Sequence, residues 1–270
     1  MSMLSRLIEE PPFRLLAYFI VKRFARSVET INHWGAVDRP NYLIGILAAA
    51  RLAKADGIGE ISVIEFGVAG GDGLSKLQEY SELVERQTGV RIFAFGFDTG
   101  EGLPALCSDY RDHPDQWQVN DYKMDVPKLR ARLTSRTRLL LGNISDTLSN
   151  FSSGGYPPIG FIACDVDLYS SARDSLRILS RPDRKMLRRV FIYFDDIDFV
   201  FNHKFAGEWL AIDEFNAENE LVKIDTWRGI KKDRVFRDEP WLEKMFIAHD
   251  LGAINGYVSR RPPSTGCALD

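Results

Sequence analysis

A run of apolar residues changes into a cluster of glycines in the stretch Val63-Ile64-Glu65-Phe66-Gly67-Val68-Ala69-Gly70-Gly71-Asp72-Gly73. The apolar run predicts a strand buried on both faces, and the amphipathic residues 74–87 that follow predict a helix. Glycine allows a tight turn and a close approach of the backbone to a ligand, and the helix N-terminus offers unpaired N–H groups. The stretch therefore predicts a strand–turn–helix unit with a ligand site at the turn.

Four further apolar runs along the chain repeat this pattern. Together, the five runs predict an α/β fold with a Rossmann-like, doubly wound, mostly parallel sheet. The expected strands are Ile61–Phe66, Ile92–Phe97, Arg138–Leu141, Phe161–Cys164 and Val190–Phe194. The expected helices are Leu74–Gln87, Val126–Leu133, Ser170–Leu179 and Glu208–Asn219, and late antiparallel strands are expected at Phe246–Ala248 and Ile254–Val258.

The chain divides into three predicted parts. Residues 1–56 form a helical N-terminal extension, residues 57–259 form the Rossmann-like domain, and residues 260–270 form a disordered tail. The extension contains an apolar run over residues 15–21, followed by Lys22, Arg23 and Arg26. This pattern predicts an amphipathic helix that packs on the domain or forms a homodimer, and attachment to a membrane surface is the alternative.

The charge balance narrows the class of partner. The 270 residues carry 35 Lys+Arg and 38 Asp+Glu, a net charge of -3, without the basic excess of a general nucleic-acid-binding protein. Cys107, Cys164 and Cys267 show no paired spacing, which indicates reduced thiols. No apolar run reaches the roughly 20 residues that span a bilayer. We therefore expect a cytoplasmic protein that acts on a small molecule, without nucleic acid or a membrane.

Polar residues follow the first three strands at their carboxyl ends, where open parallel sheets bind ligands. The glycines at 67, 70, 71 and 73 lack the Gly-x-Gly-x-x-Gly spacing of a pyrophosphate site, and Glu65 beside them favours a cationic or zwitterionic ligand. Asp98 follows the second strand, where a carboxylate can accept both hydroxyls of a ribose. Asn143 and Ser145 follow the third strand and are candidates for the wall of an adenine pocket.

The last two predicted parallel strands deliver a cluster of carboxylates. Asp165 and Asp167 follow the fourth strand, and Asp195 and Asp196 follow the fifth. Because neighbouring strands lie about 4.8 Å apart, we expect these side chains to meet at one rim of the sheet. Carboxylates without basic partners repel one another unless a divalent cation neutralises them, and oxygen ligands favour Mg²⁺. The alternative is that these aspartates cap helices or face solvent.

At these residues the sequence resembles the class I S-adenosylmethionine-dependent methyltransferases, and more narrowly the macrocin-type O-methyltransferases, which methylate sugar hydroxyls of macrolides. The resemblance runs from about Arg39 to Asp198. The segments that carry it are Glu65 to Gly71, Asp98 with Glu101-Gly102-Leu103-Pro104, Gly142 to Leu148, Asp165-Val166-Asp167-Leu168-Tyr169, and Asp195-Asp196. The Glu-Gly-Leu-Pro and Asp-x-Asp-Leu-Tyr segments together are its most specific part.

The resemblance implies S-adenosylmethionine as the cofactor. It implies that the turn from Gly67 to Gly71 holds the methionine portion, that Glu65 lies near the amino group of that portion, and that Asp98 binds the ribose. The implied acceptor is a hydroxyl of a small molecule, such as a sugar or another natural product.

The resemblance also implies a metal and a base. Asp165, Asp195 and Asp196 match metal-binding aspartates, and Asp165 or Asp167 helps to deprotonate the acceptor. Apart from the resemblance, the reaction needs a base, and the candidates in the sequence are Asp167 and His203. Mg²⁺ bound to the acceptor would lower the pKa of its hydroxyl and orient the oxygen toward the methyl group.

Three other functions stay open on the sequence alone. Asp165-Val166-Asp167 is formally the Asp-x-Asp sequence of metal-dependent glycosyltransferases, but that function leaves the glycine turn and Asp98 unexplained. A nicotinamide-dependent oxidoreductase would need the dinucleotide spacing of glycines. A non-catalytic protein on the same fold would bind the cofactor without turnover and would bind no metal.

Overall fold

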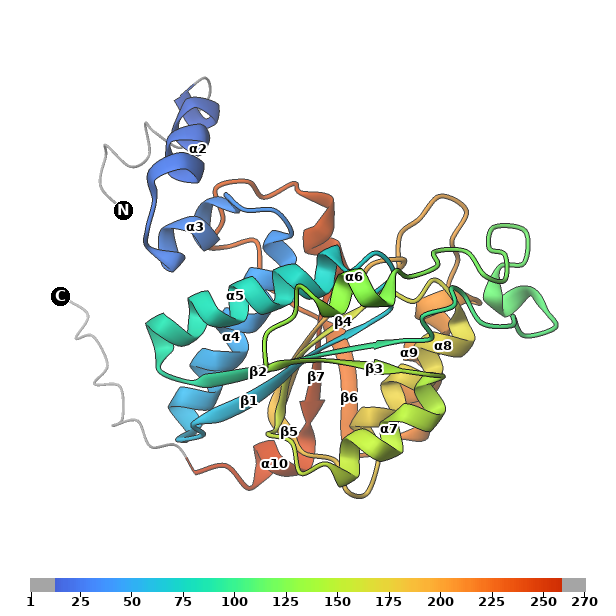
Figure 1. Cartoon of the computed structure of the whole chain (residues 1–270). Helices are drawn as coiled ribbons and strands as arrows, with labels where there is room; N and C mark the ends of the chain where they lie inside the picture. Colours follow the sequence, from blue (N-terminus) through green and yellow to red (C-terminus); the bar gives the residue numbers. More distant parts are fainter. Residues whose placement is uncertain (1–12, 259–270) are drawn as a thin grey trace.

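The computed structural model describes residues 13–258, apart from the side chains of Ser152 and Ser153. In this part of the chain, one seven-stranded sheet carries helices on both faces (Figure 1). The strand order is β3-β2-β1-β4-β5-β7-β6. This arrangement confirms the predicted Rossmann-like α/β fold.

Five neighbouring strands are parallel, and each contains most or all of one predicted apolar run. They are β1 (Glu60–Phe66), β2 (Arg91–Asp98), β3 (Thr137–Leu141), β4 (Ile159–Cys164) and β5 (Met186–Phe194). Every residue of β4 is buried, as is every residue of β1 after the first. Burial on both faces explains why these strands are apolar without alternation.

The late part of the chain departs from the prediction at one of its two expected strands. β7 (Met245–Asp250) pairs antiparallel with β5 and contains the predicted Phe246–Ala248. The strand predicted at Ile254–Val258 is wrong, because the short helix α10 (Leu251–Asn255) occupies the start of that segment. The carboxylate of Asp250 caps this helix, since it accepts a hydrogen bond of 2.9 Å from the Ala253 N–H.

The outermost strand, β6 (Val222–Thr226), is absent from the sequence prediction. It pairs antiparallel with β7, and only Val222 and Ile224 are buried in it. Two apolar residues in alternation are a weak signal, because the pattern indicates a strand only when it extends further. α9 (Gly207–Glu218), which precedes this strand, contains most of the predicted helix Glu208–Asn219.

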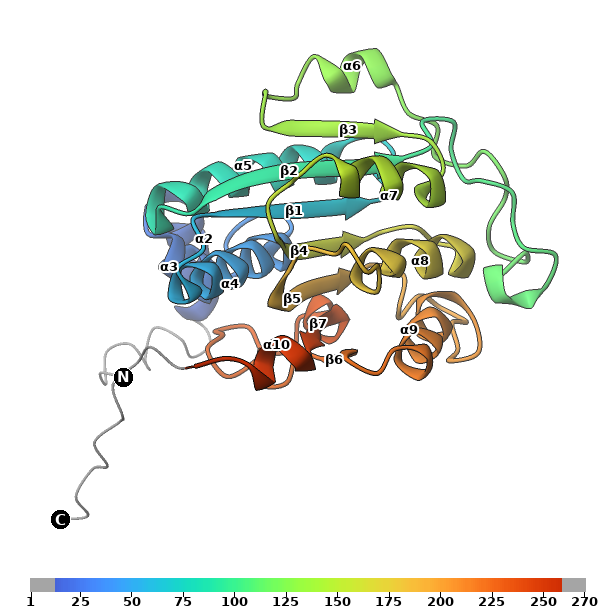
Figure 2. The ribbon, with the colours of Figure 1, turned by 90° about the horizontal axis from the view of Figure 1, so that it is seen from below.

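Helices cover the sheet in two layers (Figures 1 and 2). α4 (Pro40–Asp56) and α5 (Asp72–Thr88) pack on one face, whereas α7 (Ile144–Ser153), α8 (Tyr169–Leu176) and α9 pack on the other. α7 is a helix that the sequence analysis did not predict. The remaining short elements are α6 (Val126–Arg130) and the 3₁₀ turns Tyr110–Asp112, Arg177–Leu179 and Pro240–Lys244.

The N-terminal segment contains helices of two kinds. α2 (Phe13–Phe24) and α3 (Val28–Trp34) lie beyond α4 and α5, away from the sheet (Figure 1), whereas α4 is largely buried. α2 leaves six large apolar side chains 52–71% exposed: Phe13, Leu15, Leu16, Phe19, Ile20 and Phe24. Within residues 13–258, every helix is too short or too polar to cross a membrane. The homodimer and the domain boundary at residue 56 stay predictions, and the tail at 260–270 lies outside the described residues.

The order of the strands reverses beside β1. The chain runs from β1 to β2 and β3 on one side, and then crosses to β4 on the other side of β1. Sheets of this kind bind ligands outside the carboxyl ends of the strands at such a reversal. Figure 2 shows the arrowheads of β1 to β5 facing one end of the molecule, where the green segment around residue 110 projects beyond them.

Candidate functional site

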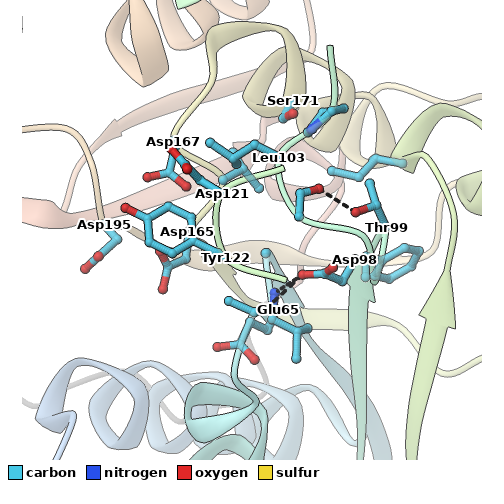
Figure 3. Close-up of a pocket in the computed structure, with 18 of the residues that line it drawn as sticks. Glu65, Asp98, Thr99, Leu103, Asp121, Tyr122, Asp165, Asp167, Ser171 and Asp195 are labelled. Atoms are coloured by element: carbon cyan, nitrogen blue, oxygen red, sulfur yellow. Dashed lines mark hydrogen bonds between the residues drawn. The ribbon is translucent and has the colours of Figure 1, made fainter. Parts of the chain in front are cut away.

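A cavity of about 640 Å³ lies at the carboxyl ends of the parallel strands (Figure 3). Its volume is within the range of sites for small molecules. The structure brings ten predicted site residues into its lining, all but the candidate base His203: Glu65, Gly67, Gly71, Asp98, Asn143, Ser145, Asp165, Asp167, Asp195 and Asp196. Their roles in binding and catalysis stay predictions.

The turn after β1 is built from glycines at positions where a side chain would collide with its neighbours. Gly67 has a φ of +81°, and a Cβ at this position would overlap the carbonyl oxygen of Asp165. Gly71 has a φ of +85°, and a Cβ there would overlap the side chain of Leu129. Gly70, between them, faces open space. Gly67 therefore lets the turns after β1 and β4 touch, and Gly71 lets Leu129 of α6 pack against the start of α5.

Glu65 lies at this turn as a buried carboxylate with one unpaired oxygen. Its side chain lines the cavity although the residue is only 1% exposed. Oε1 accepts a 2.6 Å hydrogen bond from the Tyr42 hydroxyl, whereas Oε2 has no partner among the described residues. Burial raises the pKa of Glu65 to about 8, although the hydrogen bond from Tyr42 opposes the rise. An unpaired buried oxygen of this kind fits a ligand that carries a cationic amino group.

Arg39, the residue before α4, reaches the same end of the cavity. Its Nη1 lies 3.3 Å from the Tyr42 hydroxyl and 3.8 Å from Oδ2 of Asp165. Arg39 is the only basic side chain among the described residues that line the cavity. Sequence analysis assigned no role to Arg39 or Tyr42, because both lie in the predicted extension. The sole signal in the sequence was that the family resemblance begins near Arg39.

Asp98, at the end of β2, holds the glycine turn in place. Oδ2 accepts hydrogen bonds of 2.8 and 2.9 Å from the N–H groups of Val68 and Ala69, and Oδ1 accepts one of 2.6 Å from Gly100. A carboxylate has about four acceptor positions, so Asp98 keeps capacity for a ligand hydroxyl. The carboxylate of Asp98 therefore stabilises the turn, in addition to its predicted role in binding a ribose.

Asn143 and Ser145 lie on the side of the cavity next to β3. Asn143 is the N-cap of α7, and its side chain makes no capping hydrogen bond. Ser145 stands in the first turn of that helix. Both side chains belong to the lining, together with the aromatic Phe97 and the apolar Leu103. The position suits the wall of a pocket for a planar base.

Four carboxylates meet at the other end of the cavity, which we call the acidic rim: Asp165, Asp167, Asp195 and Asp196. Figure 3 shows three of them, Asp165, Asp167 and Asp195, on the opposite side from Asp98. Oδ2 of Asp196 accepts a 3.0 Å hydrogen bond from the Asp167 N–H, and Asp195 accepts one from the Tyr193 hydroxyl. Burial, and then the charges of neighbouring aspartates, raise the pKa values of Asp165, Asp167 and Asp196.

Two side chains behind the acidic rim hold its backbone, and the sequence analysis missed both. Glu208, in the first turn of α9, is fully buried, and its Oε2 accepts a 3.0 Å hydrogen bond from the Asp196 N–H. Lys244 donates a 2.6 Å hydrogen bond to the Asp195 carbonyl and lies 2.7 Å from Oδ1 of Asp198. Both come from beyond the parallel strands, so no spacing in the sequence links them to the rim.

The described residues do not show the predicted metal site. Oxygen donors from two neighbouring strands suit a hard cation such as Mg²⁺. Among residues 13–258, however, no group of three His, Cys, Asp or Glu side chains is arranged to hold a metal ion. The donor chemistry therefore fits, whereas the side chains would have to rotate to surround an ion. The metal stays a prediction.

The segment from Leu103 to Asp121 forms a fixed wall of the cavity. Its two ends are joined, because the Leu103 N–H donates a 2.8 Å hydrogen bond to the Asp121 carbonyl. Its middle is anchored by the fully buried Asp112, whose carboxylate accepts hydrogen bonds of 2.8 and 2.9 Å from the N–H and hydroxyl of Ser170. Tyr122, just after this segment, has a φ of +63° and lines the cavity.

His203, one of the two candidate bases, is not among the residues that line the cavity. Its ring centroid lies 5.1 Å from that of His113 and 6.2 Å from that of Phe205. Asp167 does line the cavity. The geometry therefore favours Asp167 over His203 as the candidate base.

The chain is similar to the crystal structure of CalS11, a calicheamicin methyltransferase, with 18% identity, a TM-score of 0.56, and coverage of 89% of this chain and 93% of that chain. The shared feature is the fold. Two further structures have lower TM-scores. The O-methyltransferase NovP is 16% identical, with a TM-score of 0.48 and coverage of 76% of this chain and 90% of that chain. The apo structure of CalS11, a TDP-rhamnose 3'-O-methyltransferase, is 19% identical, with a TM-score of 0.47 and coverage of 89% of this chain and 95% of that chain. No protein-family model and no curated protein sequence matches the chain.

Proposed function

We propose that this protein is an S-adenosylmethionine-dependent O-methyltransferase that acts on a hydroxyl of a small molecule. The observation that carries the proposal is the buried Glu65, whose Oε2 is unpaired at the glycine turn, with Asp98 at the end of the next strand. These two carboxylates can receive an amino group and a ribose, which are both parts of this cofactor. A pyrophosphate at the same turn would be repelled by Glu65, which disfavours a nicotinamide dinucleotide.

The acidic rim supplies the groups that the transfer needs from the protein. When bound, the cofactor supplies a sulfonium methyl group, whose C–S bond breaks with its electron pair left on a neutral sulfur. We assign Asp167 as the base that takes the acceptor proton as the acceptor oxygen bonds to the methyl carbon, because its raised pKa lies nearer to neutral pH. Asp165 orients the hydroxyl, and positioning of the two reactants contributes about 7 kcal/mol or more.

The charge of the rim favours a neutral acceptor with several hydroxyls, such as a sugar or another natural product. Asp121 extends the acidic lining near Asp167, and Arg39 is the one basic side chain among the described lining residues. Hydroxyl groups donate strong hydrogen bonds to carboxylates, whereas an anionic acceptor would be repelled. The ring of Tyr122 offers an apolar face beside them.

We further propose that Mg²⁺ assists the reaction at the acidic rim, held by Asp165, Asp195 and Asp196. Their oxygens suit this ion, and their mutual repulsion would be relieved by it. A bound cation would lower the pKa of the acceptor hydroxyl. Titration calorimetry with Mg²⁺ tests this part separately: we expect a binding heat in the wild type that disappears in Asp195→Ala. The absence of a heat in the wild type would contradict metal assistance and leave the cofactor proposal standing.

Calorimetric titration of S-adenosylmethionine and S-adenosylhomocysteine tests the main proposal. We expect dissociation constants near the micromolar range and at least a tenfold weakening in Asp98→Ala, because that carboxylate binds the ribose and holds the turn. The control is Glu79→Ala, since Glu79 is exposed on α5 outside the cavity. Failure of both ligands to bind would overturn the proposal, and nucleotide-sugars would then test the glycosyltransferase alternative. Binding without transfer to any hydroxylated acceptor would support the non-catalytic alternative.

A further inference from the structure

A carboxyl group and a guanidinium group lie on the two sides of one tyrosine hydroxyl at the glycine-turn end of the cavity. The Tyr42 hydroxyl donates a 2.6 Å hydrogen bond to Oε1 of Glu65, and Nη1 of Arg39 donates a 3.3 Å hydrogen bond to the same hydroxyl. Both charged side chains line the cavity. A ligand that entered here would therefore meet a carboxyl group and a cationic group close together, and an ammonium group on the ligand would favour the ionised form of that carboxyl.

Each of these groups keeps unused hydrogen-bonding capacity. A guanidinium group has five N–H donors, and Arg39 uses one of them toward the described residues. Asp165, at 3.8 Å, lies beyond hydrogen-bond distance, and the Arg39 side chain is 35% exposed. Glu65 adds the unpaired Oε2. The planar guanidinium can bind a carboxylate through two parallel hydrogen bonds, and the carboxylate of Glu65 can accept from an ammonium group.

The backbone holds Arg39 at this place before any ligand arrives. Arg39 is the N-cap of α4 with a φ of +51°, and Pro40 follows as the first residue of the helix. Such a conformation is unfavourable for a residue other than glycine and persists where the surrounding structure requires it. The guanidinium also lies 5.2 Å from the centre of the Tyr42 ring. A side chain that is already placed loses less entropy when it binds.

We propose that Arg39 binds the α-carboxylate of the methionine portion of the cofactor, while Glu65 receives its α-ammonium group. The inference rests on the proposed function and adds the residue that recognises the carboxylate. An amino acid zwitterion carries its ammonium and carboxylate groups on one carbon, which matches a carboxyl group and a guanidinium group that both contact the Tyr42 hydroxyl. Arg39 and Tyr42 thereby make the N-terminal segment part of the binding site.

Three ligands that differ in the amino acid portion test this assignment by calorimetry. S-adenosylhomocysteine carries both charged groups, its decarboxylated analogue keeps the amine alone, and 5'-methylthioadenosine has neither. In Arg39→Ala we expect the dissociation constant of S-adenosylhomocysteine to rise by roughly 10- to 100-fold, the range of a charged hydrogen bond. The constants of the other two ligands should change by less than about threefold. Arg39→Lys should restore part of the lost affinity, because lysine keeps the positive charge but lacks the planar guanidinium that forms two parallel hydrogen bonds.

The controls separate this inference from the proposed function. Glu65→Gln should weaken both ligands that carry the amine and spare 5'-methylthioadenosine. Arg51→Ala, also on α4 but at an exposed ion pair with Glu29, should change none of the three constants. An unchanged constant for S-adenosylhomocysteine in Arg39→Ala, or an equal loss for all three ligands, would overturn the role of Arg39. If the wild type bound none of the three, the proposed function itself would fail.

Discussion

The two ends of the cavity handle charge in opposite ways. At the glycine-turn end, Arg39 stands near Glu65, and Asp98 is satisfied by three backbone N–H groups. At the acidic rim, four aspartates lie close together, Arg39 stands 3.8 Å from Asp165, and Lys244 reaches the rim from behind. The first end is prepared for one zwitterionic ligand by the backbone and by a guanidinium group beside a carboxyl group. The rim holds more acidic than basic groups, which suits the end where the acceptor loses its proton.

Asp167→Asn tests this division with the largest expected effect. We expect the rate of methyl transfer to fall by about 10²- to 10⁴-fold, the usual contribution of a general base. The dissociation constant of S-adenosylhomocysteine should stay within about twofold, because Asp167 belongs to the other end of the cavity. Initial rates with an acceptor from a screen of hydroxylated compounds provide the measurement.

Asp174→Asn is the matched control for this variant. Asp174 also lines the cavity, but its charge is balanced by Arg173 at 3.3 Å and Arg177 at 3.1 Å. We expect its rate of transfer to change by less than about threefold. Equal losses in the two variants would mean that the total charge of the rim matters and that Asp167 has no separate role as a base.

Gly67→Ala tests how far the backbone prepares the glycine-turn end. A Cβ would overlap the Asp165 carbonyl at a positive φ, and backbone cannot rotate away as a flexible side chain can. We expect the free energy of unfolding in urea to fall by about 3 kcal/mol or more. Gly70→Ala, three residues on and facing open space, should change it by less than about 0.5 kcal/mol. Similar values for the two variants would show that the turn relaxes freely.

The same comparison explains what the sequence can predict. Glu65, Asp98 and the aspartates of the rim follow apolar runs directly, and parallel strands bring their carboxyl ends together, so their meeting could be predicted. Arg39 comes from a segment that precedes the sheet, and only the packing of α4 against it carries that residue to the turn. Glu208 reaches the rim in the same way from α9. Contacts of this kind depend on tertiary packing and leave no pattern along the chain.

The edge of the sheet shows the same limit at the level of the fold. β6 has two buried residues, too few for a recognisable alternation. The apolar residues around α10 also suit a strand, and the hydrogen bond from the Ala253 N–H to Asp250 favours the helix there. The fully buried strands needed no such detail, because five apolar runs separated by helices have few other arrangements. The prediction was therefore strongest where burial was greatest.

Glu65→Gln tests the protonation of the glycine-turn end and has the smallest expected effect of these variants. In the folded protein the pKa of Glu65 is about 8, against an ordinary value of 4.5, because the carboxylate is buried. Between these pH values the folded protein holds a proton that the unfolded chain has released, so this group makes the wild type less stable as the pH rises. Glutamine does not titrate, and the variant loses this dependence.

The stability gap between Glu65→Gln and the wild type should therefore widen with pH in favour of the variant. A single proton contributes at most about 1.4 kcal/mol per pH unit, so we expect the gap in urea unfolding to grow by about 1 kcal/mol between pH 6 and pH 7. Glu79→Gln, at an exposed position on α5, should show a constant gap. A constant gap for Glu65→Gln as well would mean that Arg39 keeps the carboxylate ionised in the free protein, so that the glycine-turn end already holds a balanced pair of charges before the ligand binds.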